Sequence, residues 1–481
     1  MSTITELKPN NVWKHFYAIC QIPHASKKEE KLVAYMKEFG EGLGLETIVD
    51  HVGNVLIRKP ATAGNENASG VVLQAHLDMV VQKNSDTEHN FDTDPIQTYI
   101  DGDWVKAKGT TLGADNGMGA AAIMAVLESK DLTHGPLEAL FTVDEEAGMT
   151  GAFELSPDVL QGKMLINTDT EEDELIVGCA GGIDTIITMN YETDHAPENH
   201  QAYTVNLTGL KGGHSGMDIN IGRGNAAQLL AGLLLKATRD YDLRVASFNA
   251  GTVRNAIPRE GFATVTVSIE QQGDFHKFVK ECEKTIQTQY KETEPAAVIT
   301  VTGIDKPTVV MSAFLQESLL VAITECPNGV MTVSEELGIV ETSTSMGVVN
   351  VADGKVEIIC LQRSAVDAKR DETAAKVKAC FEKVSGANVV HEGAYPGWQP
   401  ILDSELLLKT KDVYKNLFQR EPKVNAVHAG LECALLKKLY PHFECISMGP
   451  TIDFPHSPDE RVNIASVENF WNLFTETLKK L

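Results

Sequence analysis

The sequence predicts an α/β protein: one domain with a mixed sheet flanked by helices, interrupted by an inserted α+β domain. In the first part of the chain, apolar strand-like runs alternate with helical patterns, and several runs end in charged residues. From about residue 184 the pattern changes, and after about residue 392 runs that end in acids and histidines return. We therefore expect a catalytic domain over 1–183 and 393–481, and an inserted domain over 184–392.

The elements of the first part follow from its periodicity. A helical pattern over residues 11–45 is broken at QIPHAS, and GLETIVDHVGNVLIRK is typical of two strands joined by a turn. LQAHLDMVV, residues 73–81, has the composition of a buried strand. A glycine-rich loop then passes into a helix near Asn116, and further strands are expected over 137–143 and in KMLINTDT. Ligands of such sheets bind at the carboxyl ends of the strands, so we expect the site there.

The inserted part predicts two series of strands and helices. The first has strands at AYTVNLTGL, RVASFNAG, GFATVTVSIE and AAVITVTGI, with helices at GNAAQLLAGLLLKATRD and DFHKFVKECEKTIQTQY. The second contains ETSTSMGVVNVADGKVEIICLQRS and a helix at DETAAKVKACFEKV. These patterns favour two α+β halves, although the halves are too dissimilar in sequence to be a repeat.

Composition excludes several classes of function. A net charge of -25 argues against nucleic acid or an anionic membrane surface as a partner. No secretory signal or stretch of about 20 apolar residues is present. The eight cysteines include no C-x-x-C pair, which fits reduced thiols in the cytoplasm.

His76 and Asp78 are unusual residues for a buried strand. Alternation along a strand would place both on one face, where they can act together. A buried carboxylate needs a partner, and a metal-binding histidine often donates its second ring proton to one. On this stretch alone, a hydrogen-bonded core pair is an equally good explanation.

The acids and histidines at the ends of the expected strands together suit a catalytic metal site. Histidine and carboxylate ligands without cysteine are typical of catalytic Zn²⁺ or Mn²⁺. Two metal ions about 3.5–4 Å apart need a bridging carboxylate. Asp115, in a glycine-flanked loop, can supply it. The set comprises His76, Asp78, Asp115, Glu145, Glu146, Asp169 and His456.

Glu145 and Glu146 can divide two tasks between them. One carboxylate can bind metal while its neighbour takes a proton from the attacking water. An acidic surface turn is the common alternative for two adjacent glutamates. The apolar strand directly before the pair favours the catalytic interpretation.

Eight motifs in order resemble the cytosolic nonspecific dipeptidases, also called aminoacyl-histidine or Xaa-His dipeptidases. These enzymes belong to the di-zinc peptidases that include acetylornithine deacetylase and glutamate carboxypeptidase. The resemblance spans nearly the whole chain. Its motifs are LQAHLDMV, GTTLGADNGMG, TVDEEAGMTGA, INTDTEE, GGHSG, VRNAIP, HAGLE and PHSPDE.

The resemblance implies two zinc ions per chain, with Mn²⁺ or Co²⁺ as substitutes. His76 and Asp169 would bind one ion and Glu146 and His456 the other, with Asp115 bridging. Asp78 would orient His76, and Glu145 would be the general base that activates a metal-bridging water. The peptide bond between Asp115 and Asn116 is cis in such relatives.

In that family the inserted domain is a lid and dimerisation domain. His214 resembles a histidine that polarises the scissile carbonyl in the neighbouring subunit of a homodimer, and Asn255 and Arg363 resemble groups that bind the substrate carboxylate. His428 and Gly430 would add to the substrate pocket, while Glu432 is equally consistent with a structural role. Without the resemblance, GGHSG is simply a flexible turn and a lone arginine is a solvated one. Asp453 and Phe454 replace smaller residues of relatives, which leaves the loop shape before His456 open.

The resemblance therefore predicts a cytoplasmic dipeptidase that acts on unblocked L-dipeptides, including Xaa-His dipeptides such as carnosine. An N-acyl amino-acid deacylase or a tripeptide aminopeptidase with the same two metals is the nearby alternative. A catalytically inactive relative that binds metal or peptide is a third possibility. It is disfavoured because every metal-ligand position and Glu145 are filled.

Overall fold

The computed structural model describes residues 3–481 and divides them into two compact units. Unit 1 comprises the chain up to Gly178 with Trp398–Ala426 and Leu431–Leu481, and unit 2 comprises Cys179–Gly397 with Val427–Gly430. The boundaries expected from the sequence lay at 183/184 and 392/393. The short segment Val427–Gly430, which joins unit 2 from within the C-terminal part of the chain, has no counterpart in that division.

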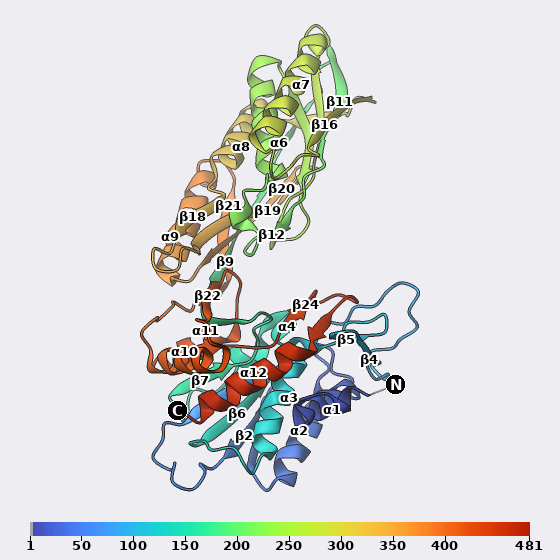
Figure 1. The fold of residues 1–481 in the computed structure, drawn as a ribbon. Coiled ribbons are helices and arrows are strands. Elements are labelled where there is room, and N and C mark those ends of the chain that lie inside the picture. The colour runs from blue at the N-terminus through green and yellow to red at the C-terminus, as the bar shows by residue number, and fades with distance from the viewer. Residues whose placement is uncertain (1–2) are drawn as a thin grey trace. The chain divides into compact units, whose positions relative to one another are not determined.

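Unit 1 is built on an eight-stranded mixed sheet with the order β1-β2-β6-β3-β7-β23-β8-β22 (Figure 1). The chain leaves this sheet for a small four-stranded sheet with the order β24-β25-β5-β4. The strands of unit 1 are β1 (Glu46–Val49), β2 (Val55–Lys59), β3 (Val71–His76), β4 (Thr98–Asp101), β5 (Trp104–Ala107), β6 (Leu137–Thr142), β7 (Met164–Asn167), β8 (Glu174–Cys179), β22 (Lys423–Val427), β23 (Glu444–Ser447), β24 (Ile452–Asp453) and β25 (Arg461–Asn463).

Helices cover this sheet and complete one hydrophobic core. α3 packs between α1 and β3, and α10 packs against α12 and β23. From Gly117 to Leu127 every residue of α3 is buried, which is why its sequence is apolar on all sides rather than on one stripe. The helices are α1 (Asn10–Cys20), α2 (Glu30–Gly42), α3 (Ala114–Glu128), α4 (Glu145–Gly148), α5 (Thr150–Phe153), α10 (Glu405–Phe418), α11 (Glu432–Leu439) and α12 (Ile464–Leu478), after a 3₁₀ turn at Ile4–Glu6.

The expectation of a single strand over residues 73–81 is wrong. β3 runs from Val71 to His76, and Asp78 lies beyond its end. The chain leaves the sheet there because the Met79 amide bonds to the carbonyl of His24 instead of to a neighbouring strand. His76 and Asp78 are therefore not alternate residues of one strand, although both are buried.

Unit 2 is a nine-stranded sheet with helices along one face and its own hydrophobic core. The sheet order is β16-β11-β15-β13-β19-β20-β9-β21, with β18 paired to β19. Two further pairs, β10 with β17 and β12 with β14, form separate two-stranded sheets. The strands of unit 2 are β9 (Gly181–Asn190), β10 (Thr193–His195), β11 (His200–Thr208), β12 (Gly213–His214), β13 (Arg244–Ala250), β14 (Ala256–Ile257), β15 (Gly261–Ser268), β16 (Val298–Ile304), β17 (Val309–Met311), β18 (Gly329–Val333), β19 (Val340–Ala352), β20 (Lys355–Ser364) and β21 (Asn388–Tyr395).

The two expected α+β halves of unit 2 share this continuous sheet. Two helices, α6 and α7, pack on the half that contains β11 and β15, and α9 packs on β9 and β20 of the other half. α8 packs between α6 and α9, so the helices form one layer (Figure 1). Their bounds are α6 (Ala226–Asp240), α7 (Gln272–Gln289), α8 (Ala313–Glu325) and α9 (Asp367–Phe381), with a 3₁₀ turn at Ile219–Ile221.

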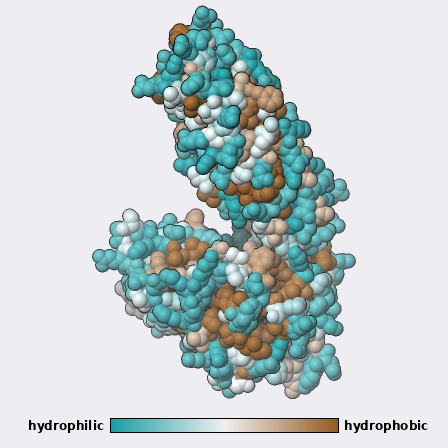
Figure 2. All heavy atoms as spheres, turned by 180° about the vertical axis from the view of Figure 1, so that it is seen from behind, coloured by the Kyte–Doolittle hydropathy of each residue, from teal (hydrophilic) through white to brown (hydrophobic). Residues whose placement is uncertain are grey.

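The surface agrees with the acidic composition. On the face drawn in Figure 2, hydrophilic side chains dominate and hydrophobic ones gather in separate patches on each unit. None of the helices within residues 3–481 combines the length and apolar character that crossing a membrane requires.

Candidate active site

The carboxyl edge of the unit 1 sheet gathers most of the expected metal ligands. β3 runs parallel to β6 and β7, so these three strands end at the same edge. His76 is the last residue of β3, Glu145 opens α4 just after β6, and Asp169 follows β7. Asp115 lies in the first turn of α3, after the loop that leads into it, and its peptide bond to Asn116 is cis.

The two carboxylate oxygens of Asp115 face different histidines. Asp115 Oδ1 lies 3.2 Å from His76 Nε2, and Asp115 Oδ2 lies 3.3 Å from His456 Nε2. Asp169 Oδ1 lies 3.3 Å from His76 Nε2 on one side, and Glu146 Oε1 lies 3.0 Å from His456 Nε2 on the other. Each side thus has one imidazole and one carboxylate of its own and shares Asp115, the arrangement that a bridging carboxylate serves.

This donor set fits a pair of divalent cations. Ligand atoms of His76, Asp115 and Asp169 lie within 4.8 Å of one another, and so do those of Asp115, Glu146 and His456. Glu146 Oε1 is buried and accepts no hydrogen bond, although it lies 3.0 Å from His456 Nε2. Two ligand atoms that approach closely without a hydrogen bond fit a shared cation, and nitrogen and oxygen donors of this kind suit Zn²⁺, Mn²⁺ or Co²⁺.

Asp78 connects His76 to the two glutamates. His76 Nδ1 lies 3.0 Å from the Asp78 carbonyl oxygen and 3.5 Å from its carboxylate. That carboxylate accepts the amides of Glu145 and Glu146, at 2.9 and 3.1 Å. Burial raises the pKa of Asp78, but the hydrogen bond and charge of His76 and the Glu145 amide outweigh burial and lower it. Asp78 therefore stays ionised and fixes both His76 and the first turn of α4.

The environment of Glu145 suits a group that takes up and releases a proton. Burial raises its pKa well above the usual range against the opposing charge of His76, and the carboxylates of Asp169 and Glu432 raise it further. A general base is most effective when its pKa lies near the working pH, and burial is the usual means of raising a glutamate toward it.

Two further acids lie near this cluster. Glu171 was not predicted from the sequence, and the role of Glu432 was left open there. Burial raises the pKa of Glu171 to about 8, and the charges of Asp115 and Asp169 add to the effect. Its only sequence signal is its place two residues after Asp169. Glu432 Oε2 accepts hydrogen bonds from Gln74 Nε2 at 2.6 Å and Thr142 Oγ1 at 2.7 Å, so it ties α11 to the strands beneath the site.

The loop before His456 is held by an arginine. Arg461 binds the Asp453 carboxylate through Nε at 2.9 Å and Nη2 at 2.7 Å. Its guanidinium also lies 4.2 Å from the ring centre of Trp104 and 5.3 Å from that of Phe454. Asp453 and Phe454 therefore both contact the same anchoring side chain.

In unit 2, His214 and Asn255 lie on adjoining segments. His214 in β12 is the pairing neighbour of Ala256 in β14, and the Ser215 amide donates to the Asn255 carbonyl oxygen at 2.8 Å. The amides of Gly216 and Met217 donate to His214 Nδ1, at 3.2 and 2.9 Å. Because burial and then the charge of Arg363 lower the pKa of His214 to about 4, the ring is neutral near pH 7 and carries its proton on Nε2. The side chain of Asn255 is exposed.

Arg363 is a buried cation without a direct ion-pair partner among the described residues. It is 4% exposed, its Nη1 donates to Tyr395 Oη at 2.9 Å, and its Nε has no hydrogen-bond partner. Within residues 3–481 it forms no ion pair. A buried guanidinium with an unused N–H donor is suited to an anionic ligand such as a carboxylate. Tyr395 gave no signal in the sequence.

His428 contacts Ser343 of β19, whose pairing partner in β20 is Arg363. Ser343 pairs with Arg363 across β19 and β20, and its Oγ lies 2.7 Å from His428 Nε2. Burial, then the charges of Arg363 and His214, lower the pKa of His428 to about 3. Gly430 ends the four-residue segment that carries His428 into unit 2. Within unit 2, His214 and His428 therefore both lie close enough to the buried Arg363 for its charge to lower their pKa values.

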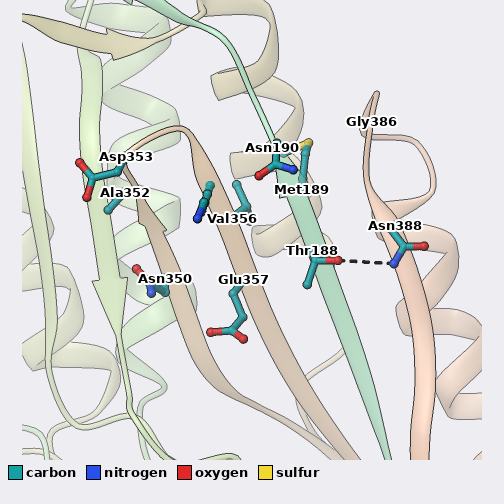
Figure 3. A pocket seen from close by; sticks show the side chains of 11 residues that line it. Thr188, Met189, Asn190, Asn350, Ala352, Asp353, Val356, Glu357, Gly386 and Asn388 are labelled. Atoms are coloured by element: carbon teal, nitrogen blue, oxygen red, sulfur yellow. Dashed lines mark hydrogen bonds between the residues drawn. The ribbon is translucent and has the colours of Figure 1, made fainter.

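A polar pocket of about 720 Å³ lies elsewhere in unit 2, on the sheet strands β9, β19 and β20 and next to β21 (Figure 3). Thr188, Asn190, Asn350, Glu357 and Asn388 are among its lining residues, and Asn388 donates to Thr188 at 3.4 Å. None of the expected site residues lines it. Large volume alone therefore does not identify the active site of this protein.

Comparison with known proteins finds peptidases by family, by sequence and by structure. The family model for peptidase family M20/M25/M40 matches residues 72–480. The cytosol non-specific dipeptidase of Escherichia coli K12 is 45% identical over 483 residues, which cover 100% of this chain and 99% of the relative. The crystal structure of aminoacylhistidine dipeptidase from Vibrio alginolyticus has a TM-score of 0.92 and 45% identity, and the match covers 100% of this chain and 98% of that one. Aminopeptidase PepT from Bacillus cereus shares the fold, with a TM-score of 0.62 at 15% identity over 98% of this chain and 99% of that one.

Proposed function

The chain belongs to peptidase family M20/M25/M40, and we propose that it hydrolyses unblocked L-dipeptides of broad sequence, including Xaa-His dipeptides such as carnosine. It is a metallopeptidase that cleaves peptide bonds. The carrying observation is the shared Asp115 carboxylate, whose oxygens face His76 on one side and His456 on the other. Similarity over the full chain to two proteins named as dipeptidases supports the substrate class.

Two zinc ions per chain are the proposed cofactors, with Mn²⁺ or Co²⁺ as substitutes. His76 and Asp169 would hold one ion, Glu146 and His456 the other, and Asp115 both. When bound, the cations act as Lewis acids that make water more acidic and polarise the peptide carbonyl. Asp78 would orient the proposed ligands, because it accepts the first two α4 amides and contacts His76.

Glu145 is the proposed general base and general acid. Its carboxylate takes a proton from the attacking water and afterwards delivers that proton to the nitrogen of the leaving amine. Burial raises its pKa, and a raised pKa makes the carboxylate a stronger proton acceptor in the first step.

Unit 2 supplies the proposed recognition of the substrate. Arg363, with Asn255, would bind the free carboxylate of the dipeptide, and His428 and Gly430 would line the pocket. His214 would donate its Nε2 proton to the carbonyl oxygen as negative charge develops there. We propose a homodimer formed through this inserted domain, in which the partner subunit's His214 completes each site.

The setting we propose is the cytoplasm, with no nucleic acid or membrane as partner. The name of the Escherichia coli relative and the net charge of -25 support this.

A substrate panel tests the proposed activity. Zinc-loaded protein is assayed with free dipeptides, N-acetyl amino acids and tripeptides at equal concentrations. We expect the highest kcat/KM for free dipeptides. A higher value for N-acetyl amino acids would indicate a deacylase, a higher value for tripeptides would indicate an aminopeptidase, and no turnover would indicate a binding protein.

Replacing Arg363 tests carboxylate recognition. Arg363→Ala should raise KM for free dipeptides by about 10- to 100-fold, because it removes a charged hydrogen-bond donor from a buried site. C-terminally amidated dipeptides should be poor substrates of the native enzyme and should lose little more in the variant. Steady-state kinetics on both substrate series measure this.

Arg244→Ala is the matched control for the loss of an arginine. Arg244 is also in unit 2, but its guanidinium already pairs with Asp194 at 2.8 Å. The Arg244→Ala variant should therefore keep the native preference for free over amidated dipeptides. Equal cleavage of free and amidated dipeptides by the native enzyme would show that Arg363 does not bind the substrate carboxylate.

A further inference from the structure

Glu460 is a buried carboxylate that no step above uses. It ends the PHSPDE motif, four residues after His456 and directly before β25. It is 2% exposed. Within residues 3–481 it forms no ion pair, so other groups must compensate its buried charge.

Four main-chain amides of one distant loop provide that compensation. Glu460 Oε2 accepts the amides of Leu112 at 2.7 Å and Gly113 at 3.0 Å. Glu460 Oε1 accepts those of Ala114 at 2.8 Å and Asp115 at 3.4 Å. The first amides of a helix have no partners inside the helix, and Glu460 takes up those at the start of α3.

The conformation of this loop depends on such an acceptor. Gly113 has a φ of +71°, which lets successive amides turn toward one point, and an added Cβ there would lie 3.0 Å from the Met79 sulfur. Successive amides that point inward form a concave anion site. Here the chain fills that site with its own carboxylate.

The two ends of this contact carry two of the expected metal ligands. The amide that Glu460 reaches at 3.4 Å belongs to Asp115, and the hairpin that carries Glu460 also carries His456. Asp115 and His456 are 341 residues apart in the chain, and their side chains meet at 3.3 Å. No other side chain of residues 3–481 accepts any of these four amides.

We propose that Glu460 is a positioning residue that fixes the Asp115 loop to the His456 hairpin and so sets the spacing of the two metal positions. The inference deepens the proposed function and rests on it. Glu460 touches neither the substrate nor a reacting atom. It acts through the main chain of Asp115, whose carboxylate serves both cations.

Glu460→Gln tests the proposal because it preserves the shape of the side chain. A glutamine offers one acceptor oxygen and an NH₂ group that faces two amide donors. In metal-free protein, exchange of the amides of residues 112–115 should become about tenfold faster or more, measured by hydrogen exchange and mass spectrometry. Zinc affinity should weaken by about 10- to 100-fold, as for other residues that orient metal ligands. On zinc-loaded protein kcat should fall while KM changes little.

Glu294→Gln is the control for losing a buried carboxylate that holds amides. Glu294 is 0% exposed and accepts the amides of Lys211 at 2.8 Å and Gly224 at 3.0 Å, in unit 2. The Glu294→Gln variant should have a lower free energy of unfolding, but its amides at 112–115 should exchange at the native rate and its zinc affinity should be native. Glu460→Asp, which keeps the charge on a shorter side chain, should be intermediate and serves if Glu460→Gln does not fold.

Normal exchange at 112–115 with native zinc affinity in Glu460→Gln would overturn the proposal. Equal zinc loss in Glu294→Gln would also overturn it, because the effect would then be one of general stability. The exchange measurement needs no bound metal. If native protein bound no zinc, the proposed function would fail. Faster exchange at 112–115 in Glu460→Gln would still show that Glu460 fixes the Asp115 loop.

Discussion

Glu145→Gln should lower kcat by about 10²- to 10⁴-fold while zinc content stays near native, because the change removes the proton acceptor without removing a proposed ligand. The glutamine keeps the size of the side chain, and the α4 amides remain bound to Asp78. Steady-state kinetics and metal analysis by mass spectrometry on the same sample measure both quantities.

Glu146→Gln is the matched variant, since it makes the same change one residue later. Glu146 Oε1 lies 3.0 Å from His456 Nε2 and is a proposed ligand, so this variant should lose zinc as well as activity. Near-native kcat in Glu145→Gln would remove Glu145 from the mechanism, and equal zinc loss in both variants would show that the two carboxylates do not divide their tasks.

His214→Ala should lower kcat by about 10²- to 10³-fold, the usual cost of removing a donor to a developing oxyanion. The amides of Gly216 and Met217 occupy Nδ1, so only Nε2 can supply this proton. If the partner subunit's His214 completes each site, mixing His214→Ala with Glu145→Ala should restore activity. With random exchange about half of the dimers are mixed and about a quarter of all sites are complete.

A second pairing separates complementation from other effects of mixing. Glu145→Ala mixed with His76→Ala leaves a defect in unit 1 of both chains, so no complete site can form in either arrangement. Activity is measured after co-refolding, and native mass spectrometry counts the mixed dimers. Mixed dimers without recovered activity would place His214 in the site of its own chain, and a monomeric native protein would exclude the trans arrangement directly.

The family resemblance and the fold class predicted from the motifs are confirmed by the family match over residues 72–480 and by the TM-score of 0.92 to a dipeptidase. The convergence of His76, Glu146 and Asp169 was predictable because they lie at or just after the ends of the parallel strands β3, β6 and β7, which share one edge of the sheet. Asp115 enters from the loop before α3, and only its glycine-flanked position suggested it as the bridging ligand. His456, which comes from a distant hairpin, was a candidate ligand from the sequence alone, and only the resemblance assigned it to one of the two metal ions. The roles of all these residues remain predictions.

Other parts of the site depend on contacts that no local pattern encodes. Asp78 was expected on a strand beside His76, but it lies beyond the strand end, where its carboxylate binds the α4 amides. Glu460 and Glu432 are ordinary acids in sequence, and their importance depends on amides and side chains hundreds of residues away. Periodicity reports which face a residue occupies, whereas these contacts depend on how loops close over one another.

Dipeptide hydrolysis as a function of zinc content tests the two-metal mechanism most directly. Native protein is stripped with a chelator, zinc is restored in steps, and bound zinc per chain is measured beside kcat on one free dipeptide. We expect no hydrolysis without metal and full activity at about two zinc ions per chain. Full hydrolysis by the metal-free protein, or zinc binding that saturates at one ion per chain, would contradict the mechanism.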